Sequence, residues 1–168
     1  MPMSEYIRDL RSKIGTTVLE VPTVSIIVQD PLERVLLVRH VEGNVWTTPG
    51  GMVEPYEVPA DAAVRETWEE TGLHVELTRI IGVFGGKICS GSYSNGDKIS
   101  WISTVFAAKA LGGTLQPDGE ETLEVRYFSR DELHGLRCKP HVPLMLDAAH
   151  ATDQAAQFQR ATWTPPSG

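Results

Sequence analysis

The chain has 168 residues, of which 41% are hydrophobic and 22% are charged, and its formal net charge is −7. This composition is typical of one globular domain and excludes a disordered chain. The acidic balance, with no run of Lys or Arg, excludes a broad nucleic-acid-binding surface. No stretch approaches the roughly 18 apolar residues of a membrane span, and Cys89 and Cys138 fit no metal-binding pattern. We therefore expect a cytoplasmic protein with reduced thiols and no membrane partner.

The first predicted element is a short helix that ends at Gly15. Ser4 can cap its start, and apolar side chains recur within it at helical spacing: Tyr6, Ile7, Leu10 and Ile14. We interpret residues 1–15 as an N-terminal helical arm. Its apolar side chains indicate either packing on the chain's own domain or contact with a second subunit in a homodimer.

Two strands are predicted next. The segment Thr17–Gln29 is rich in Val, Ile and Thr, and Val35–Val38 returns as a buried strand after the turn at Asp30-Pro31. His40 begins a loop that extends to Val45. Its imidazole is either a substrate contact or an ordinary loop or core histidine.

A helix is predicted from Pro59 to Thr71, because proline suits a first helical turn and Gly72 is a natural stop. One face is small and largely apolar, and we expect it to pack on the domain: Ala60, Ala63, Val64, Thr67, Trp68 and Thr71. The opposite face is charged: Arg65, Glu66, Glu69 and Glu70. Each pair of like charges three or four residues apart costs roughly 0.2–0.5 kcal/mol in an isolated helix, whereas a hard divalent cation seeks such carboxylates. The acidic face is therefore either solvated or a cation site.

The residues before this helix extend the charged face into a longer pattern. Gly51 is followed after five residues by Glu57, after seven more by Arg65-Glu66, and then by Glu69-Glu70 and Gly72-Leu73. This resembles the Nudix box, Gly-x5-Glu-x7-Arg-Glu-U-x-Glu-Glu-x-Gly-U, in which U is apolar. Every Gly, Glu and Arg of the box is present, although Thr67 occupies the first U position. The preceding residues, Trp46 to Gly51, are similar to the family's usual entry into the box.

The resemblance implies a Nudix-type α/β/α sandwich with a mixed β-sheet. The remaining predicted elements are compatible with that fold: strands at Val75–Phe84, Ile99–Ala110 and Leu123–Phe128, and a helix from Pro143 to about Gln157. We assign residues 16–150 to the Nudix hydrolase domain. Residues 151–168 are interpreted as the end of the last helix and a flexible tail.

The resemblance also implies a pyrophosphohydrolase that uses Mg²⁺ or Mn²⁺ to cleave a nucleoside diphosphate linked to another moiety. By motif position, the metal ligands would be Gly50, through its carbonyl, and Glu66, Glu69 and Glu70. Glu57 and Arg65 would take part in catalysis by supporting these ligands. A carboxylate-held cation neutralises a polyphosphate and lowers the pKa of the attacking water, so the residue types suit this chemistry.

The general base of many family members lies outside the box, in a loop before the last strand. The segment from Asp118 to Phe128 resembles that acidic approach. Glu121 matches the position best, and Glu120 is the alternative. Either residue is equally compatible with an ordinary loop charge.

Four aromatic residues are candidates for stacking on a base, or alternatively for packing: Trp46, Tyr56, Tyr93 and Trp101. Tyr56 stands where the family commonly has glycine, and a positive φ there would strain a bulky residue. The extensions that mark NADH and ADP-ribose hydrolases are absent. We expect a small nucleotide substrate, such as a nucleoside triphosphate, nucleotide sugar or dinucleoside polyphosphate. The alternative is a Nudix-fold ligand-binding or regulatory module without turnover.

Overall fold

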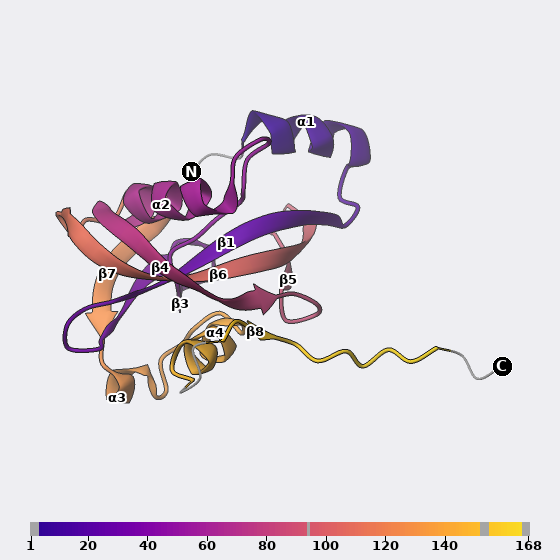
Figure 1. Ribbon diagram of the computed structural model, residues 1–168. Helices are drawn as coiled ribbons and strands as arrows, with labels where there is room; N and C mark the ends of the chain where they lie inside the picture. The colour runs from indigo at the N-terminus through magenta and orange to yellow at the C-terminus, as the bar shows by residue number, and fades with distance from the viewer. Residues whose placement is uncertain (1–3, 94, 152–154, 166–168) are drawn as a thin grey trace.

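The computed structural model describes residues 4–93, 95–151 and 155–165, which fold around one mixed β-sheet (Figure 1). The strands in these residues are β1 (Leu19–Gln29), β2 (Val35–His40), β3 (Val45–Thr47), β4 (Leu73–Phe84), β5 (Ser90–Ser92), β6 (Lys98–Gly113), β7 (Thr122–Phe128) and β8 (Gln157–Phe158). The helices are α1 (Glu5–Ile14), the 3-10 turn η1 (Glu42–Asn44), α2 (Pro59–Thr71), α3 (Arg130–Leu133) and α4 (Val142–Ala149). None of these described helices is long and apolar enough to cross a membrane.

The main path of the sheet is β3-β2-β1-β6-β4-β8, with β5 paired to β6 and β7 paired to β2. The central pair, β1 and β6, is parallel, whereas β4 runs antiparallel to β6. Helices α1 and α2 lie on one face of the sheet and α4 lies on the other (Figure 1). The predicted α/β/α sandwich is therefore confirmed.

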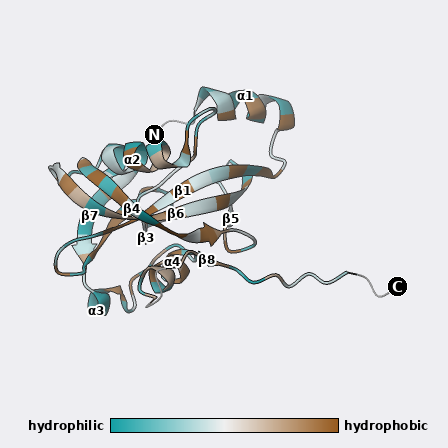
Figure 2. Ribbon diagram, viewed as in Figure 1, coloured by the Kyte–Doolittle hydropathy of each residue, from teal (hydrophilic) through white to brown (hydrophobic). Residues whose placement is uncertain are grey.

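Strand β1 supplies both layers of the core, because successive side chains of a strand point to opposite faces. Val24, Ile26 and Val28 pack in the cluster beneath α2. Ile27 packs in the cluster that includes Met145 of α4. A strand buried on both faces is apolar without alternation, which explains the Val- and Ile-rich run. Figure 2 shows the complementary pattern on α1 and α2, which mix hydrophobic and hydrophilic residues.

The predicted strands all form, with ends shifted by a few residues, and α2 has the predicted bounds. Gly72 ends α2 in the left-handed conformation, with a φ of 72°. The N-terminal helix also forms, and the Ser4 hydroxyl accepts a hydrogen bond from the Ile7 amide at 3.3 Å. Ile7 is only 6% exposed, so the arm packs on its own domain.

The prediction for the last helix was wrong in its second half. Helix α4 ends at Ala149, and Gln157–Phe158 instead form β8, which pairs in parallel with β4 (Figure 1). Gly82 allows this pairing, since a Cβ at that position would overlap the Gln157 carbonyl. Tertiary pairing at the sheet edge thus replaces helix in this segment. The predicted tail lies partly outside the described residues, at 152–154 and 166–168.

The predicted packing face of α2 was right for Ala63, Thr67 and Thr71, which are buried, and wrong for its other three residues, because the helix is rotated relative to that expectation. Val64 and Trp68 were expected to be buried, yet they are 38% and 47% exposed, and Ala60 is exposed too. The buried residues are Ala62, Ala63, Glu66, Thr67, Glu70 and Thr71. The expectation assumed that charged side chains face water, whereas two glutamates here face the interior. Trp68 instead stacks on the surface against His74, with ring centroids 4.3 Å apart.

Candidate active site

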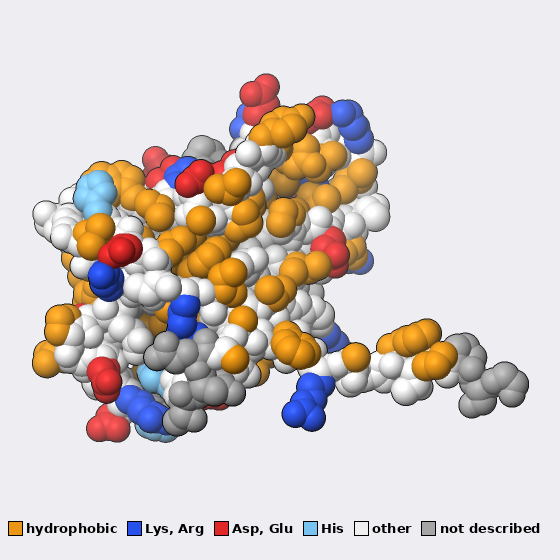
Figure 3. Space-filling view, in the orientation of Figure 1, with side chains coloured by type: hydrophobic (Ala, Val, Ile, Leu, Met, Phe, Trp, Pro, Cys, Tyr) orange, Lys and Arg blue, Asp and Glu red, His pale blue; other side chains and the backbone are white. Residues whose placement is uncertain are grey.

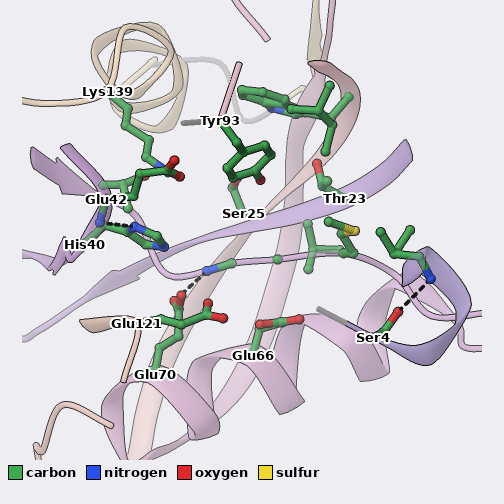
Figure 4. A pocket seen from close by; sticks show the side chains of 18 of the residues that line it. Ser4, Thr23, Ser25, His40, Glu42, Glu66, Glu70, Tyr93, Glu121 and Lys139 are labelled. Carbon is green, nitrogen blue, oxygen red and sulfur yellow. Dashed lines mark hydrogen bonds between the residues drawn. The ribbon is translucent and has the colours of Figure 1, made fainter. Parts of the chain in front are cut away.

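A cavity of about 580 Å³ lies beside α2 and extends beneath α1 (Figure 4). Carboxylates line one part of it: Glu66, Glu70, Glu120 and Glu121. Basic or imidazole side chains line another part: His40, Lys139 and His141. Apolar and aromatic side chains line the end beneath α1: Ile7, Met52, Tyr93, Ile99 and Trp101. The cavity therefore joins a charged end to an apolar end.

The first residues of the box lie between β1 and α2. The Ile26 amide donates to the Pro49 carbonyl and the Val24 amide donates to the Gly51 carbonyl, each at 2.9 Å. A Cβ at Gly50 would overlap the backbone of β1, and one at Gly51 would overlap the carboxylate of Glu66. The two glycines thus let the segment pass between β1 and the glutamates of the helix.

Glu66 and Glu70 lie one turn apart on the face of α2 that lines the cavity (Figure 4). Glu70 is 5% exposed and accepts a hydrogen bond from the Gly50 amide at 3.0 Å. Burial raises the pKa of Glu70 to about 8, with the neighbouring charge of Glu66 adding to the rise. Burial likewise raises the pKa of Glu66, although Arg65 opposes it. Two buried carboxylates that are costly to ionise together are well suited to a bound cation.

Arg65 connects the other box glutamates to this pair. Its guanidinium donates to both carboxylate oxygens of Glu57, at 2.8 and 2.9 Å, to Glu66 at 2.8 Å and to Glu69 at 3.0 Å. It also donates to the Met52 carbonyl at 3.1 Å. The hydrogen bonds from Arg65 lower the pKa of Glu57, which stays ionised. Glu57 and Glu69 therefore face Arg65 and do not line the cavity.

The loop before β7 brings two more carboxylates to the cavity. The Asp118 carboxylate accepts hydrogen bonds from the amides of Glu120 at 2.8 Å and Glu121 at 3.0 Å. The Thr122 hydroxyl donates to the Glu70 carbonyl at 3.3 Å, which ties the loop to α2. Glu120 and Glu121 both line the cavity, and the geometry does not choose between them. The assignment of Glu121 as general base stays a prediction.

Lys139, which sequence reasoning missed, approaches from the side opposite Glu66 and Glu70 (Figure 4). Its amide donates to the Trp46 carbonyl at 2.9 Å, so pairing with the end of β3 places it there. Burial lowers its pKa, while Glu70 and Glu42 favour the charged form. Burial also lowers the pKa of His40 to about 4, so this imidazole is neutral at neutral pH. No motif marks Lys139, since a long-range backbone contact alone brings it to the site.

The four aromatic candidates separate into two pairs. Tyr93 and Trp101 line the cavity, whereas Trp46 and Tyr56 do not. Trp46 is 9% exposed and packs edge-on against Phe128, with centroids 4.6 Å apart, so it is a core residue. Tyr56 is fully exposed and has the positive φ, 68°, that was suspected from its position. Neither Trp46 nor Tyr56 is placed to stack on a ligand in this cavity.

The donor set at the charged end suits a small hard cation. Within the described residues, no three carboxylate, imidazole or thiolate side chains form a metal site by themselves. Mg²⁺ is usually held by one or two carboxylates, with waters and substrate phosphates completing its shell. Glu66 and Glu70, together with the adjacent Gly50 backbone, match that requirement.

Comparisons with known proteins point to one family. The NUDIX domain family model matches residues 19–150. A MutT-like protein of Streptomyces ambofaciens is 31% identical over 115 residues, which are 68% of this chain and 68% of the relative. The 8-oxo-dGDP phosphatase NUDT18 of Homo sapiens is 29% identical over 140 residues, which cover 79% of this chain but only 38% of that protein. The solved structure of a MutT NUDIX hydrolase from Burkholderia pseudomallei has a TM-score of 0.65 at 22% identity, covering 77% of this chain and 98% of that one. That structural likeness concerns the fold.

Proposed function

Because the chain belongs to the Nudix family and is a hydrolase of phosphoanhydride bonds, we propose that it is a metal-dependent pyrophosphohydrolase of small nucleotides. Its cofactor would be Mg²⁺, with Mn²⁺ as the alternative. The observation that carries this proposal is the pair of buried carboxylates, Glu66 and Glu70, on one wall of a cavity that Lys139 enters from the other.

Glu66, Glu70 and the Gly50 carbonyl would hold the cation. When bound, the cation would neutralise phosphate charge and lower the pKa of the attacking water. Arg65 orients Glu66 through their 2.8 Å hydrogen bond. The same guanidinium binds Glu57 and Glu69, so these two glutamates act as positioning residues. Glu69 would have to break its hydrogen bond with Arg65 in order to bind the cation directly.

Glu121, or its neighbour Glu120, would accept the proton of the attacking water. The loop that carries both is tied to α2 through Thr122, so a carboxylate is held close to Glu70. Lys139 would contact the phosphates from the opposite wall, where an ammonium can offset their charge. His40, neutral beside it, could then serve as a hydrogen-bonding group.

The substrate class is a nucleoside triphosphate, a nucleotide sugar or a dinucleoside polyphosphate. The cavity volume of about 580 Å³ falls within the roughly 300–1,000 Å³ of small-molecule sites. The human relative is named for 8-oxo-dGDP, so oxidised guanine nucleotides belong among the substrates to be tested first.

The test is hydrolysis of a panel of these compounds with Mg²⁺, with products separated as phosphate, pyrophosphate or nucleoside monophosphate. Glu70→Gln should abolish turnover, because it removes a ligand charge. Glu76→Gln is the matched control, since Glu76 is 54% exposed and pairs only with Lys109 on the surface in the described contacts. Tight binding of a nucleotide without turnover would instead indicate the ligand-binding module.

A homodimer in the cytoplasm is the proposed state of the protein. Figure 3 shows hydrophobic side chains spread over the side of the molecule that faces the viewer, between α1 and α2 above and α4 below. Val83 and Ile102 are 47% and 48% exposed. Val83 of β4 is opposite Thr104 of β6, and Ile102 is two residues from Thr104 on the same strand, so both side chains lie on one face of the sheet. The molar mass from size-exclusion chromatography with light scattering tests this state, and a monomer at every concentration would contradict it.

A further inference from the structure

Helix α1 forms a wall of the cavity at the end away from His40 and Lys139. Ser4, Ile7 and Arg11 all line it, and Ser4 lies on the side opposite His40 and Lys139 (Figure 4). Ile7 packs with Val21 and Ile99 in a separate small core. The arm is thus part of the site, and its contribution lies beyond the residues of the box.

Arg11 connects α1 to the neighbouring segments of the domain. Its guanidinium donates to the carbonyls of Thr17 and Lys98, each at 2.7 Å, and of Gly15 at 3.1 Å, and it lies 3.7 Å from the Asp97 carboxylate. Gly15 and Thr17 belong to the chain after α1, Asp97 belongs to the turn before β6, and Lys98 is the first residue of β6. The Arg11 side chain is only 10% exposed, so the connection is shielded from water. The arm and that turn therefore form one unit.

The chemistry of this end differs from that of the charged end. Apolar side chains of Ile7, Met52 and Ile99 face the cavity together with the rings of Tyr93 and Trp101. Asp97 adds a carboxylate, which can only accept hydrogen bonds when ionised. Apolar walls and aromatic faces with a few polar groups at their edge suit a flat heterocycle. Among the described residues that line this end, Arg11 is the one cation, and its guanidinium is already engaged by backbone carbonyls.

We propose that α1 and the turn before β6 form the subsite for the nucleobase of the substrate, with Ile7 as a specificity-determining residue. This inference rests on the proposed function, because it assumes that the phosphates occupy the charged end of the same cavity. The arm would then select the moiety while the box performs the chemistry.

The experiment compares binding of nucleoside monophosphates with binding of ribose 5-phosphate, which lacks a base, by isothermal titration calorimetry. Ile7→Ala should weaken the tightest nucleoside monophosphate about tenfold, the value of one buried aliphatic contact, and leave ribose 5-phosphate unchanged. Tyr6→Ala is the matched control, because Tyr6 is on the same helix, is 50% exposed and does not line the cavity. Ile7→Val, which removes one methylene, should weaken base binding about fourfold and covers the case in which Ile7→Ala unfolds.

Equal effects of Ile7→Ala and Tyr6→Ala would overturn the subsite, as would a wild-type protein that binds ribose 5-phosphate as tightly as every nucleoside monophosphate. The turnover assay separates this failure from that of the proposed function. Binding that depends on the base and on Ile7, without hydrolysis, would support the subsite and contradict the proposal that the protein is a pyrophosphohydrolase. Hydrolysis together with nucleotide binding that does not depend on Ile7 would support the pyrophosphohydrolase and contradict the subsite.

Discussion

Arg65 holds three box glutamates at once, so its replacement should affect both stability and metal use. Arg65→Ala leaves the Glu66 carboxylate, whose side chain is 10% exposed, without its closest cationic partner. Breaking a buried ion pair costs roughly 3–5 kcal/mol. The Arg65 side chain is 27% exposed, which screens the interaction and favours the lower end of that range. We expect the free energy of unfolding to fall by about 3 kcal/mol, which lowers the melting temperature by roughly 6–12 °C in a chain of this size.

Arg65→Lys should have a smaller effect on stability, because the charge remains but the planar fork that binds both oxygens of Glu57 is lost. Since Arg65 orients Glu66, we expect the lysine variant to lose roughly 10- to 100-fold in activity or in apparent Mg²⁺ affinity. Thermal unfolding in the presence of a metal chelator measures the change in stability. Titration of turnover with Mg²⁺ measures the change in activity and in apparent Mg²⁺ affinity.

Arg126→Lys is the matched control, because Arg126 forms an exposed ion pair with Glu132 at 3.4 Å. Such a pair contributes about 0–1 kcal/mol, so this variant should behave as wild type. Wild-type melting and Mg²⁺ dependence in both Arg65 variants would refute the view that Arg65 organises the glutamates.

Three further predictions concern single side chains. Glu121→Gln should lower kcat by roughly 100- to 10,000-fold at unchanged KM if Glu121 is the general base; a loss seen in Glu120→Gln instead would transfer the role. Tyr56→Gly should raise the free energy of unfolding by about 1 kcal/mol, because the residue has a φ of 68°, and should leave KM unchanged; a lower melting temperature would contradict this. Burial lowers the pKa of His141 from 6.5 to about 4, so the unfolded chain takes up this proton more readily and stability falls as the pH drops from 6.5 toward 4. In the wild type, this proton uptake should lower the free energy of unfolding at pH 5 by on the order of 2 kcal/mol relative to pH 7, and His141→Gln should remove that difference. Urea denaturation at both pH values measures it, and the same pH dependence in the variant and the wild type would contradict the prediction.

Local signals in the chain were sufficient for the family, the sandwich fold and the limits of α2. Proline at the start of that helix and glycine at its end act within one turn, so their effect is readable from neighbouring residues. The spacing from Gly51 to Leu73 likewise lies within one continuous segment. Alternation and β-branched residues identified the main strands for the same reason.

The tertiary structure alone decided which side chains share the cavity. Glu66 and Glu70 face inward although charge normally favours water, because Gly51 leaves room for the Glu66 carboxylate and the Gly50 amide donates to Glu70. Helix α1 reaches the site through Arg11, whose partner carbonyl at Lys98 is 87 residues away in sequence. Lys139 arrives through a backbone contact with Trp46. Such contacts depend on the packing of segments distant along the chain, and no local propensity encodes them.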